Sequence, residues 1–315
     1  PVLGVVPYFY LDIDEEDSLT ERFRRKKNAG LVDIAVVRLP RISNFTDFAP
    51  LESLEEVSVR YITSPDQFGS PDAVLIPGSK NTIRDLLWMR QNGMEAKVLQ
   101  FADRGGVVFG ICGGYQMLGQ EISDPDGTEQ RGTVAGMGLL PVRTVFQQEK
   151  RRTRVEGNFL VLEGVLKELS GAPFAGYEIH MGKSTLTEGG RALASILEET
   201  VQSGISGDLI PGDVVPVDSV PVEGSTGRAH PDGACRGNVY GCYVHGIFDA
   251  PEAAGGFLSA LLKKKGCGPS EIRARDWKSY KEEQYDRLAD IIRQNVDMDA
   301  VYRIIEKGND APCIL

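Results

Sequence analysis

The chain has 315 residues, of which 41% are hydrophobic and 25% are charged, as in globular proteins with a sizeable buried core. The formal net charge of −10 argues against a dedicated nucleic-acid binder, and no apolar run approaches the roughly 18 residues of a membrane-spanning helix. The five cysteines form no C-x-x-C pair, so we expect free thiols in the cytoplasm, with no disulfide framework and no metal site.

Residues 1–30 are expected to lie outside the main domain. They open with the short apolar run PVLGVVPYFY and then turn acidic. A short apolar run of this kind is typical of a buried strand. We interpret the segment as the end of a preceding domain followed by a linker.

Residues 31–138 alternate between predicted strands and predicted helices. Short apolar runs rich in β-branched residues predict buried strands, and they are VDIAVVRL, EEVSVRYI, DAVLIP and VVFGI. Polar cap-type residues, helical spacing or a closing glycine predict the helices SKNTIRDLLWMRQNG, MEAKVLQFADRGG and GYQMLGQEI. This alternation predicts an α/β fold with a doubly wound, mainly parallel sheet and helices on both faces.

Beyond residue 138 the pattern changes to strands, which are LLPVRTVF, TRVEGNFLVL, AGYEIHMGKST and NVYGCYVHGIF. Residues 203–237 are rich in Gly, Pro, Ser and Asp, a composition that predicts a long loop or an insertion. Helical periodicity returns towards the C-terminus. We therefore expect one domain over 31–250, extended by extra strands, and a helical extension over 251–315 packed on the same domain.

One cysteine stands between glycines where a predicted strand meets a predicted helix, in the stretch GICGGYQMLG. This succession indicates a nucleophile elbow, in which the flanking glycines leave room for a sharp turn at Cys112. Those glycines are Gly110, Gly113 and Gly114. The elbow would expose the thiol at the carboxyl edge of the sheet, where the helix dipole favours a thiolate. A buried cysteine with a packing role is the alternative.

A thiolate nucleophile needs a base, and the chain offers three histidines. His245, in VYGCYVHGIF, ends a predicted apolar strand and is the favoured partner of Cys112 in thiol acyl transfer. His180 also ends a strand, whereas His230 lies in the predicted loop. In the alternative interpretation, His245 only caps its strand through a hydrogen bond to the backbone.

Two backbone N–H groups are candidates to stabilise the oxyanion of a tetrahedral intermediate. The N–H of Gly113 directly follows the nucleophile, and Gly78 follows the neighbouring strand in LIPGSKNT. Read alone, LIPGSKNT is also an ordinary turn between a strand and a helix.

Together these stretches resemble the class I, triad-type, glutamine amidotransferase domain, and within it the cobyric acid synthase branch. The matching blocks are VDIAVVRLPRISNFTDFAPL, LIPGSKNTIRDL, GICGGYQMLG, GYEIHMGKST and YGCYVHGIFD, in the family's order. The resemblance implies a flavodoxin-like sheet and hydrolysis of L-glutamine through a thioester on Cys112. It also implies that His245 acts as base and then acid, and that Gln116 contacts the substrate glutamine.

The resemblance further implies a division of labour with an amino-terminal ligase domain outside this chain. Ammonia would pass to that domain, which would use ATP and Mg²⁺ to amidate corrinoid carboxylates and convert adenosylcobyrinic acid a,c-diamide to adenosylcobyric acid. No cofactor is expected in this chain itself. The near match of GYEIHMGKS to a phosphate-binding loop is rejected, because five residues replace four and alternate like a strand.

Two features leave the site incomplete at this stage. Many class I enzymes carry a glutamate two residues after the histidine, where this chain has Ile247. Asp249 and Glu178 are candidates to orient the histidine, and a dyad or a carboxylate from the other domain is equally compatible. Arg154, in the basic run EKRRTRVEG, is a candidate to hold the glutamine carboxylate, although a solvated charge run is the favoured interpretation.

Three other functions compete with the corrinoid assignment. The glutaminase subunit of lipid II isoglutaminyl synthase has a very similar elbow and histidine block, and cobyrinic acid a,c-diamide synthase has the same architecture. The block RLPRISNFTDF and the apolar start favour the cobyric acid synthase branch. A catalytically silent docking domain of the same fold is the alternative from another class.

Overall fold

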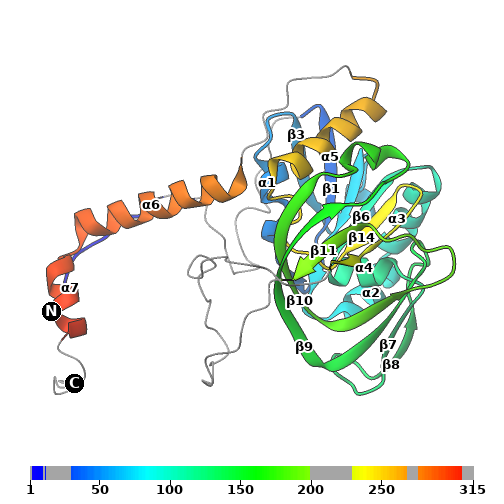
Figure 1. Ribbon diagram of the computed structural model, residues 1–315, viewed down its shortest axis with the longest axis horizontal. Coiled ribbons are helices and arrows are strands. Elements are labelled where there is room, and N and C mark those ends of the chain that lie inside the picture. The colour runs from blue at the N-terminus through cyan, green and yellow to red at the C-terminus, as the bar shows by residue number, and fades with distance from the viewer. Residues whose placement is uncertain (1, 10, 12–29, 199–228, 268–275, 307–315) are drawn as a thin grey trace. The chain divides into compact units, whose positions relative to one another are not determined.

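The computed structural model describes residues 2–9, 11, 30–198, 229–267 and 276–306 (Figure 1). The chain divides into two compact units. The larger unit spans Glu16–Arg275, and the smaller unit joins Pro1–Glu15 with Asp276–Leu315.

The larger unit is built on a six-stranded, mainly parallel sheet. Its order is β13 (Ala234–Arg236), β14 (Val239–Cys242), β6 (Val107–Ile111), β4 (Ala73–Ile76), β1 (Val32–Val37) and β3 (Val57–Ile62). Only β13 pairs antiparallel, with β14 at the edge. Read from β3, the five parallel strands have the flavodoxin-like order 2-1-3-4-5, which confirms the predicted fold class. Every residue of β4 and β6 is buried, as the continuous apolar runs predict.

Helices lie on both faces of this sheet (Figure 1). Asn81 begins one of them, because its side chain accepts a hydrogen bond from the backbone N–H of Arg84 at 3.0 Å. Ile83, Leu86 and Met89 then form its buried face, as the helical spacing predicts. The helices of the larger unit are α1 (Ala49–Glu52), α2 (Thr82–Gln91), α3 (Met94–Asp103), α4 (Gly113–Leu118) and α5 (Pro251–Lys264), with 3₁₀ turns η2 (Phe45–Phe48), η3 (Pro65–Gln67) and η4 (Val165–Leu169).

A second sheet supplies the extra strands that the sequence predicts. Its order is β12 (His230–Asp232), β11 (Ala194–Glu198), β9 (Val142–Phe159), β7 (Glu121–Asp124) and β8 (Gly132–Ala135), with β10 (Pro173–Leu186) paired to β9. Strands β9 and β10 form a long antiparallel pair, whose register shifts between His180 and Gly182. The predicted runs LLPVRTVF and TRVEGNFLVL therefore belong to one strand, which includes the basic run between them.

Part of the predicted loop over 203–237 is a regular structure. Residues 230–232 and 234–236 form β12 and β13, which pair with β11 and β14. Gly233, with φ 68°, turns the chain between them. Residues 203–228 lie outside the described residues.

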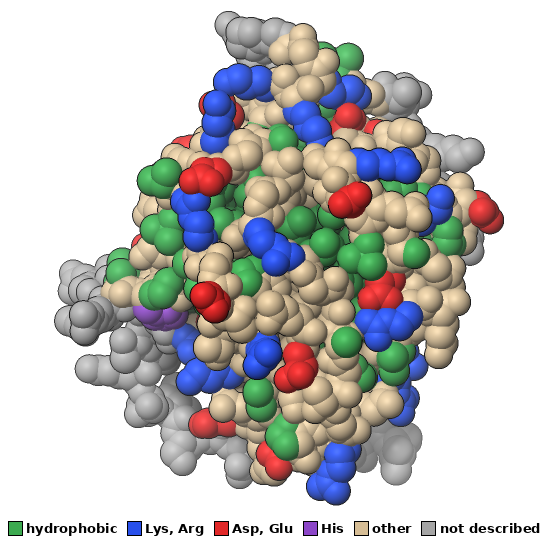
Figure 2. All heavy atoms as spheres, turned by 90° about the vertical axis from the view of Figure 1, so that its right-hand side faces the viewer, with side chains coloured by type: hydrophobic (Ala, Val, Ile, Leu, Met, Phe, Trp, Pro, Cys, Tyr) green, Lys and Arg blue, Asp and Glu red, His purple; other side chains and the backbone are tan. Residues whose placement is uncertain are grey.

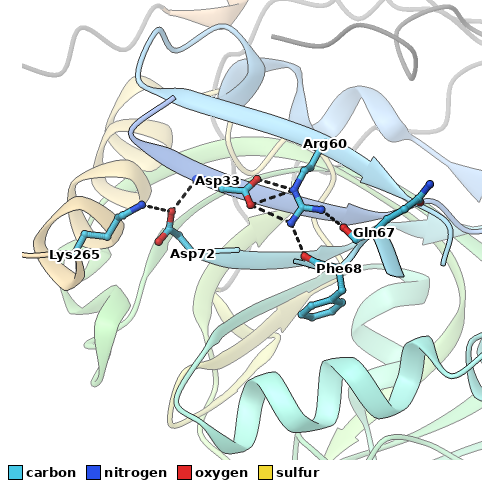
Figure 3. Close-up of polar contacts among 6 residues, drawn as sticks. All are labelled: Asp33, Arg60, Gln67, Phe68, Asp72 and Lys265. Atoms are coloured by element: carbon cyan, nitrogen blue, oxygen red, sulfur yellow. Dashed lines mark hydrogen bonds and ion pairs between the residues drawn. The ribbon is translucent and has the colours of Figure 1, made fainter. Parts of the chain in front are cut away.

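Charged side chains connect the strands of the main sheet near the edge at which β1 and β4 begin (Figure 3). The guanidinium of Arg60 on β3 donates hydrogen bonds to both carboxylate oxygens of Asp33 on β1. It also donates to the backbone carbonyls of Gln67 and Phe68. Lys265, which follows α5, binds the carboxylate of Asp72 at 2.8 Å. The same Asp72 oxygen accepts the backbone N–H of Asp33. These contacts join β1, β3, α5 and the start of β4, so the charged side chains have a structural role here.

The face shown in Figure 2 carries lysine and arginine side chains interspersed with aspartate and glutamate. Such mixing is ordinary for a globular surface. Among the described residues, no helix combines the length and the hydropathy that membrane crossing needs. Nor do the described ranges bring together three His, Cys, Asp or Glu side chains that could hold a metal ion.

The smaller unit contains α6 (Trp277–Asn295), α7 (Met298–Glu306) and the described residues near the N-terminus. Gly4 and Val296 form an isolated antiparallel bridge, and the N–H of Asp297 donates to the carbonyl of Leu3 at 2.8 Å. The predicted extension over 251–315 is thus divided, because α5 belongs to the larger unit and α6 and α7 to the smaller one.

Candidate active site

Cys112 occupies a sharp turn between β6 and α4, at the carboxyl edge of the main sheet. Its φ of 51° and ψ of −108° lie outside the helical and strand regions, a strained conformation for a residue with a side chain. The N–H of Cys112 donates to the carbonyl of Cys242 on the neighbouring strand at 2.8 Å. The residue is buried except for 8% of its surface. Cys112 thus lies at the sharp strand-to-helix turn that the sequence predicts, and its role as a nucleophile stays a prediction.

Glycines allow α4 to start directly against the neighbouring strand. A Cβ on Gly114 would lie 2.0 Å from the carbonyl oxygen of Ile76 at the end of β4. A Cβ on Gly110 would lie 2.7 Å from the backbone of Gly114 itself. Because backbone atoms cannot yield as a flexible side chain can, the elbow requires glycine at both positions.

We expect Gly114→Ala to lower the free energy of unfolding by at least about 3 kcal/mol, because its methyl group overlaps a backbone oxygen of β4. Gly256→Ala in α5 is the matched control, since a Cβ there meets a side-chain methyl of Leu169 that can move. The control should change stability by about 1 kcal/mol or less. Chemical denaturation followed by circular dichroism measures both, and equal losses would contradict this account of the elbow.

His245 is held by the carboxylate of Asp47. Its Nδ1 lies 2.8 Å from Oδ2 of Asp47, and both side chains are almost fully buried. The other oxygen of Asp47 accepts the backbone N–H of Gly246 at 3.0 Å. Because a carboxylate only accepts hydrogen bonds, Nδ1 must carry a proton, which leaves Nε2 to exchange protons. Backbone hydrogen bonds to Tyr177, whose ring stacks on the imidazole at 5.2 Å, fix the histidine further.

The surroundings favour the protonated form of His245. Burial by itself lowers the pKa of this histidine, but the charge and hydrogen bond of Asp47, together with the adjacent Cys112, outweigh it and raise the pKa to about 10. Nε2 is buried and has no hydrogen-bond partner among the described residues. His245 therefore places a positive charge beside Cys112.

The orienting carboxylate is therefore neither of the two residues predicted for that role. Glu178 binds Nε of Arg151 at 2.9 Å and lies 3.6 Å from Nε2 of His180. Asp249 follows the histidine by four residues, and its carboxylate lies against Gly246. Glu178 lies within β10 and Asp249 lies beyond β14, whereas Asp47 comes from the 3₁₀ turn η2, 198 residues before His245.

A small two-stranded sheet positions Asp47 beside the candidate oxyanion donors. Strand β2 (Ile42–Ser43) pairs antiparallel with β5 (Gly78–Ser79), and η2 with Asp47 follows β2 directly. A Cβ on Gly78 would lie 3.3 Å from Cε1 of His245, and one on Gly113 would lie 2.9 Å from the backbone nitrogen of Ser79. The structure thus brings the predicted donors Gly78 and Gly113 to the nucleophile and its base.

Gln116 lies one turn beyond the nucleophile and is buried. Its Oε1 accepts from the hydroxyl of Thr82 at 3.2 Å, and its Nε2 donates to the hydroxyl of Tyr243 at 3.1 Å. Arg154 is half-buried on β9, where its partner in the β10 register is Tyr177. The basic run therefore belongs to a strand near the site.

Strand β10 crosses over the nucleophile and adds polar groups that the sequence analysis did not assign. The Sγ of Cys112 lies 3.8 Å from the carbonyl of Ile179. The next residue, His180, stacks on Tyr243 at 3.7 Å between ring centroids, and its Nδ1 contacts the carbonyl of Gly182 at 2.7 Å. Its Nε2 is buried without a hydrogen-bond partner among the described residues, which makes it a polar group available to a ligand.

An acidic residue, Asp232, completes these surroundings. Asp232 is half-buried. Desolvation and the nearby charge of Glu178 raise its pKa to about 6, although hydrogen bonds from the backbone N–H groups of Gly233 and Tyr243 act in the opposite direction. Asp232, Glu178 and His180 therefore lie close together, and Glu178 also pairs with Arg151. Carboxylates in such a cluster can bind an ammonium group.

Comparison with known proteins gives this geometry a family. Residues 33–253 match the CobB/CobQ-like glutamine amidotransferase domain. A cobyric acid synthase of Ruminiclostridium cellulolyticum is 47% identical over 98% of this chain and 55% of its own length. One from Lachnoclostridium phytofermentans is 44% identical over 98% of this chain and 56% of its own length. A crystal structure of a glutamine amidotransferase is 18% identical, with a TM-score of 0.46, over 74% of this chain and 98% of that one.

The chain spans about half the length of the curated relatives it matches. The match to the domain family covers most of the larger unit, including the elbow, His245 and Asp47. The chain therefore belongs to the CobB/CobQ-like glutamine amidotransferase family and is a glutamine-hydrolysing amidotransferase domain.

Proposed function

We propose that this chain hydrolyses L-glutamine through a γ-glutamyl thioester on Cys112 and supplies the ammonia for corrinoid amidation. The observation that carries the proposal is the buried Asp47–His245 pair beside the strained Cys112. A nucleophile, a base and an orienting carboxylate on separate elements form the arrangement that thiol acyl transfer needs.

In the first half of the reaction, the thiolate of Cys112 attacks the side-chain carbonyl carbon of glutamine and forms a C–S bond. The N–H groups of Gly78 and Gly113 stabilise the oxyanion. Nε2 of His245 gives its proton to the leaving nitrogen, the C–N bond breaks, and ammonia departs. In the second half, neutral His245 takes a proton from water as the water oxygen attacks the thioester. The C–S bond breaks, glutamate leaves, and the thiolate and imidazolium return.

The substrate's amino-acid end is proposed to lie under β10. Gln116, already fixed by Thr82 and Tyr243, offers its amide to the polar end of glutamine. Nε2 of His180 and the nearby carboxylates favour the ammonium group, and Arg154 is retained as a candidate for the carboxylate.

The ammonia is proposed to serve a ligase part outside this chain. That part would bind ATP and Mg²⁺ and convert adenosylcobyrinic acid a,c-diamide to adenosylcobyric acid, and the whole protein would act in the cytoplasm. Relatives at 47% and 44% identity that are cobyric acid synthases support this substrate over lipid II or the a,c-diamide synthase reaction. The intact elbow and its charged histidine favour catalysis over a silent docking role.

A full-length fusion tests the assignment. The part of the Ruminiclostridium cellulolyticum cobyric acid synthase that this chain does not span is joined ahead of Pro1. With ATP, Mg²⁺ and adenosylcobyrinic acid a,c-diamide, the fusion should form the amidated corrinoid from glutamine or from ammonium chloride. Cys112→Ser should abolish only the glutamine-dependent reaction. Loss of both reactions, or of neither, would contradict the division of labour.

A further inference from the structure

Helix α7, the last of the helices that the structure describes, presents apolar side chains to solvent. Tyr302, Ile304 and Ile305 are 57%, 57% and 68% exposed. Met298, Val301, Tyr302 and Ile305 recur at the spacing i, i+3, i+4 and i+7, which places them on one face of α7. A nine-residue helix has little stability of its own in water, so a face of this kind normally packs against a partner.

The opening segment of the chain has the same character. Val2, Val5 and Tyr8 are 85%, 79% and 98% exposed, and the run VLGVVPYF contains no charge. It is joined to the helical segment by the Gly4–Val296 bridge. An extended, uncharged segment that is apolar on both sides is typical of a strand covered on both faces.

This exposure is concentrated in the smaller unit. Among the described residues, eight of the fourteen exposed large hydrophobic side chains belong to it, although the larger unit holds most of the described chain. The matches to the cobyric acid synthases cover 97–98% of this chain, so at most about ten of its residues lie outside them. Those relatives also contain about 45% of their own length beyond the match.

We propose that residues 2–8 and α7 are two pieces of the ligase domain, and that the rest of that domain docks on their apolar faces. This rests on the proposed function, which assigns the uncovered part of the relatives to the ligase. The opening segment would add a strand to a sheet of that domain, and the apolar face of α7 would pack on the same core. The glutaminase unit is then inserted between a strand and the closing helices of the ligase domain, and it is tethered at both ends.

Hydrogen exchange measured by mass spectrometry tests this arrangement in the full-length fusion described above. Amides of residues 2–8 and of α7 should exchange at least about tenfold more slowly in the fusion than in this chain alone. Peptides from β6 should exchange equally in both, because that strand is already buried. Ile305→Asp should remove the protection of α7, whereas Arg303→Asp, an exposed position off the apolar stripe, should leave it intact.

Two results would overturn the proposal. In the first, α7 exchanges equally fast with and without the ligase part. In the second, the protection of α7 in the chain alone increases with protein concentration, and sedimentation shows a dimer that Ile305→Asp dissociates. That result would mean that a second copy of the chain covers the apolar face. Glutamine hydrolysis that depends on Cys112 is measured on the same samples. Its loss with protection intact would overturn the proposed function alone, and its presence without protection would overturn only the docking.

Discussion

Replacing Cys112 by alanine is expected to lower the rate of glutamine hydrolysis in the full-length fusion by about 10⁴-fold or more, because the proposed acyl intermediate forms on this thiol. Stability should change little, since a methyl group occupies less space than the thiol. The ammonia released from glutamine is measured in a coupled assay, and intact mass spectrometry with glutamine should detect the thioester adduct only on the unsubstituted protein.

The matched control is Cys267→Ala, which removes an exposed free thiol beyond α5. Its rate should stay within about twofold of the unsubstituted protein. Hydrolysis that survives Cys112→Ala while the protein remains folded would refute the thioester mechanism. Equal losses in both variants would place the reactive thiol elsewhere.

Replacing Asp47 by asparagine is expected to lower kcat by about 10²–10⁴-fold, with a small effect on KM, because asparagine can bind the wrong tautomer of His245 and carries no charge. The pH profile should change as well. Asp47 helps raise the pKa of His245 from 6.5 to about 10, so we expect the alkaline limb of the profile near pH 10 and expect it to move downward in the variant.

The sign of the accompanying stability change follows from the same shift. A raised pKa means that the folded protein binds the His245 proton more tightly than the unfolded chain, so this stabilisation is complete below pH 6.5 and lost as pH rises through about 10. Asp47→Asn should therefore destabilise the protein more at pH 6 than at pH 10. Asp249→Asn is the control and should leave both the rate and the alkaline limb in place. A wild-type pH profile in Asp47→Asn would exclude the orienting role.

The main sheet was predictable because its strands are buried on both faces and so have continuous apolar runs. Strands β12 and β13 were not predictable, because three residues are too few to show an alternating pattern. The Gly- and Pro-rich sequence around them also favours a loop. The continuous strand β9 was predicted as two strands, because the exposed charges between Gln147 and Arg152 interrupt the apolar pattern without ending the strand.

The site shows the same limit on local patterns. Cys112 and its glycines could be predicted because the turn, the nucleophile and the helix start are consecutive. Asp47 was not predicted, because it pairs with a histidine 198 residues away and no local sequence pattern indicates that contact. One signal was available, since a charged residue inside the apolar stretch NFTDFAPL must be buried against a partner. His180 was one of three histidines considered as the base, and its place next to the residue that contacts Cys112 follows from β10 passing over the thiol.

Asp47 and His245 lie 198 residues apart, so the pair can form only after most of the larger unit has been synthesised. The carboxylate follows β2, whereas the histidine follows β14, the last of the five parallel strands along the chain. Closing so long a loop is entropically costly, and the contact forms only once the intervening strands have assembled. A chain synthesised only as far as α4 has the thiol but lacks His245, so the site is complete only when β14 and the histidine that follows it are in place.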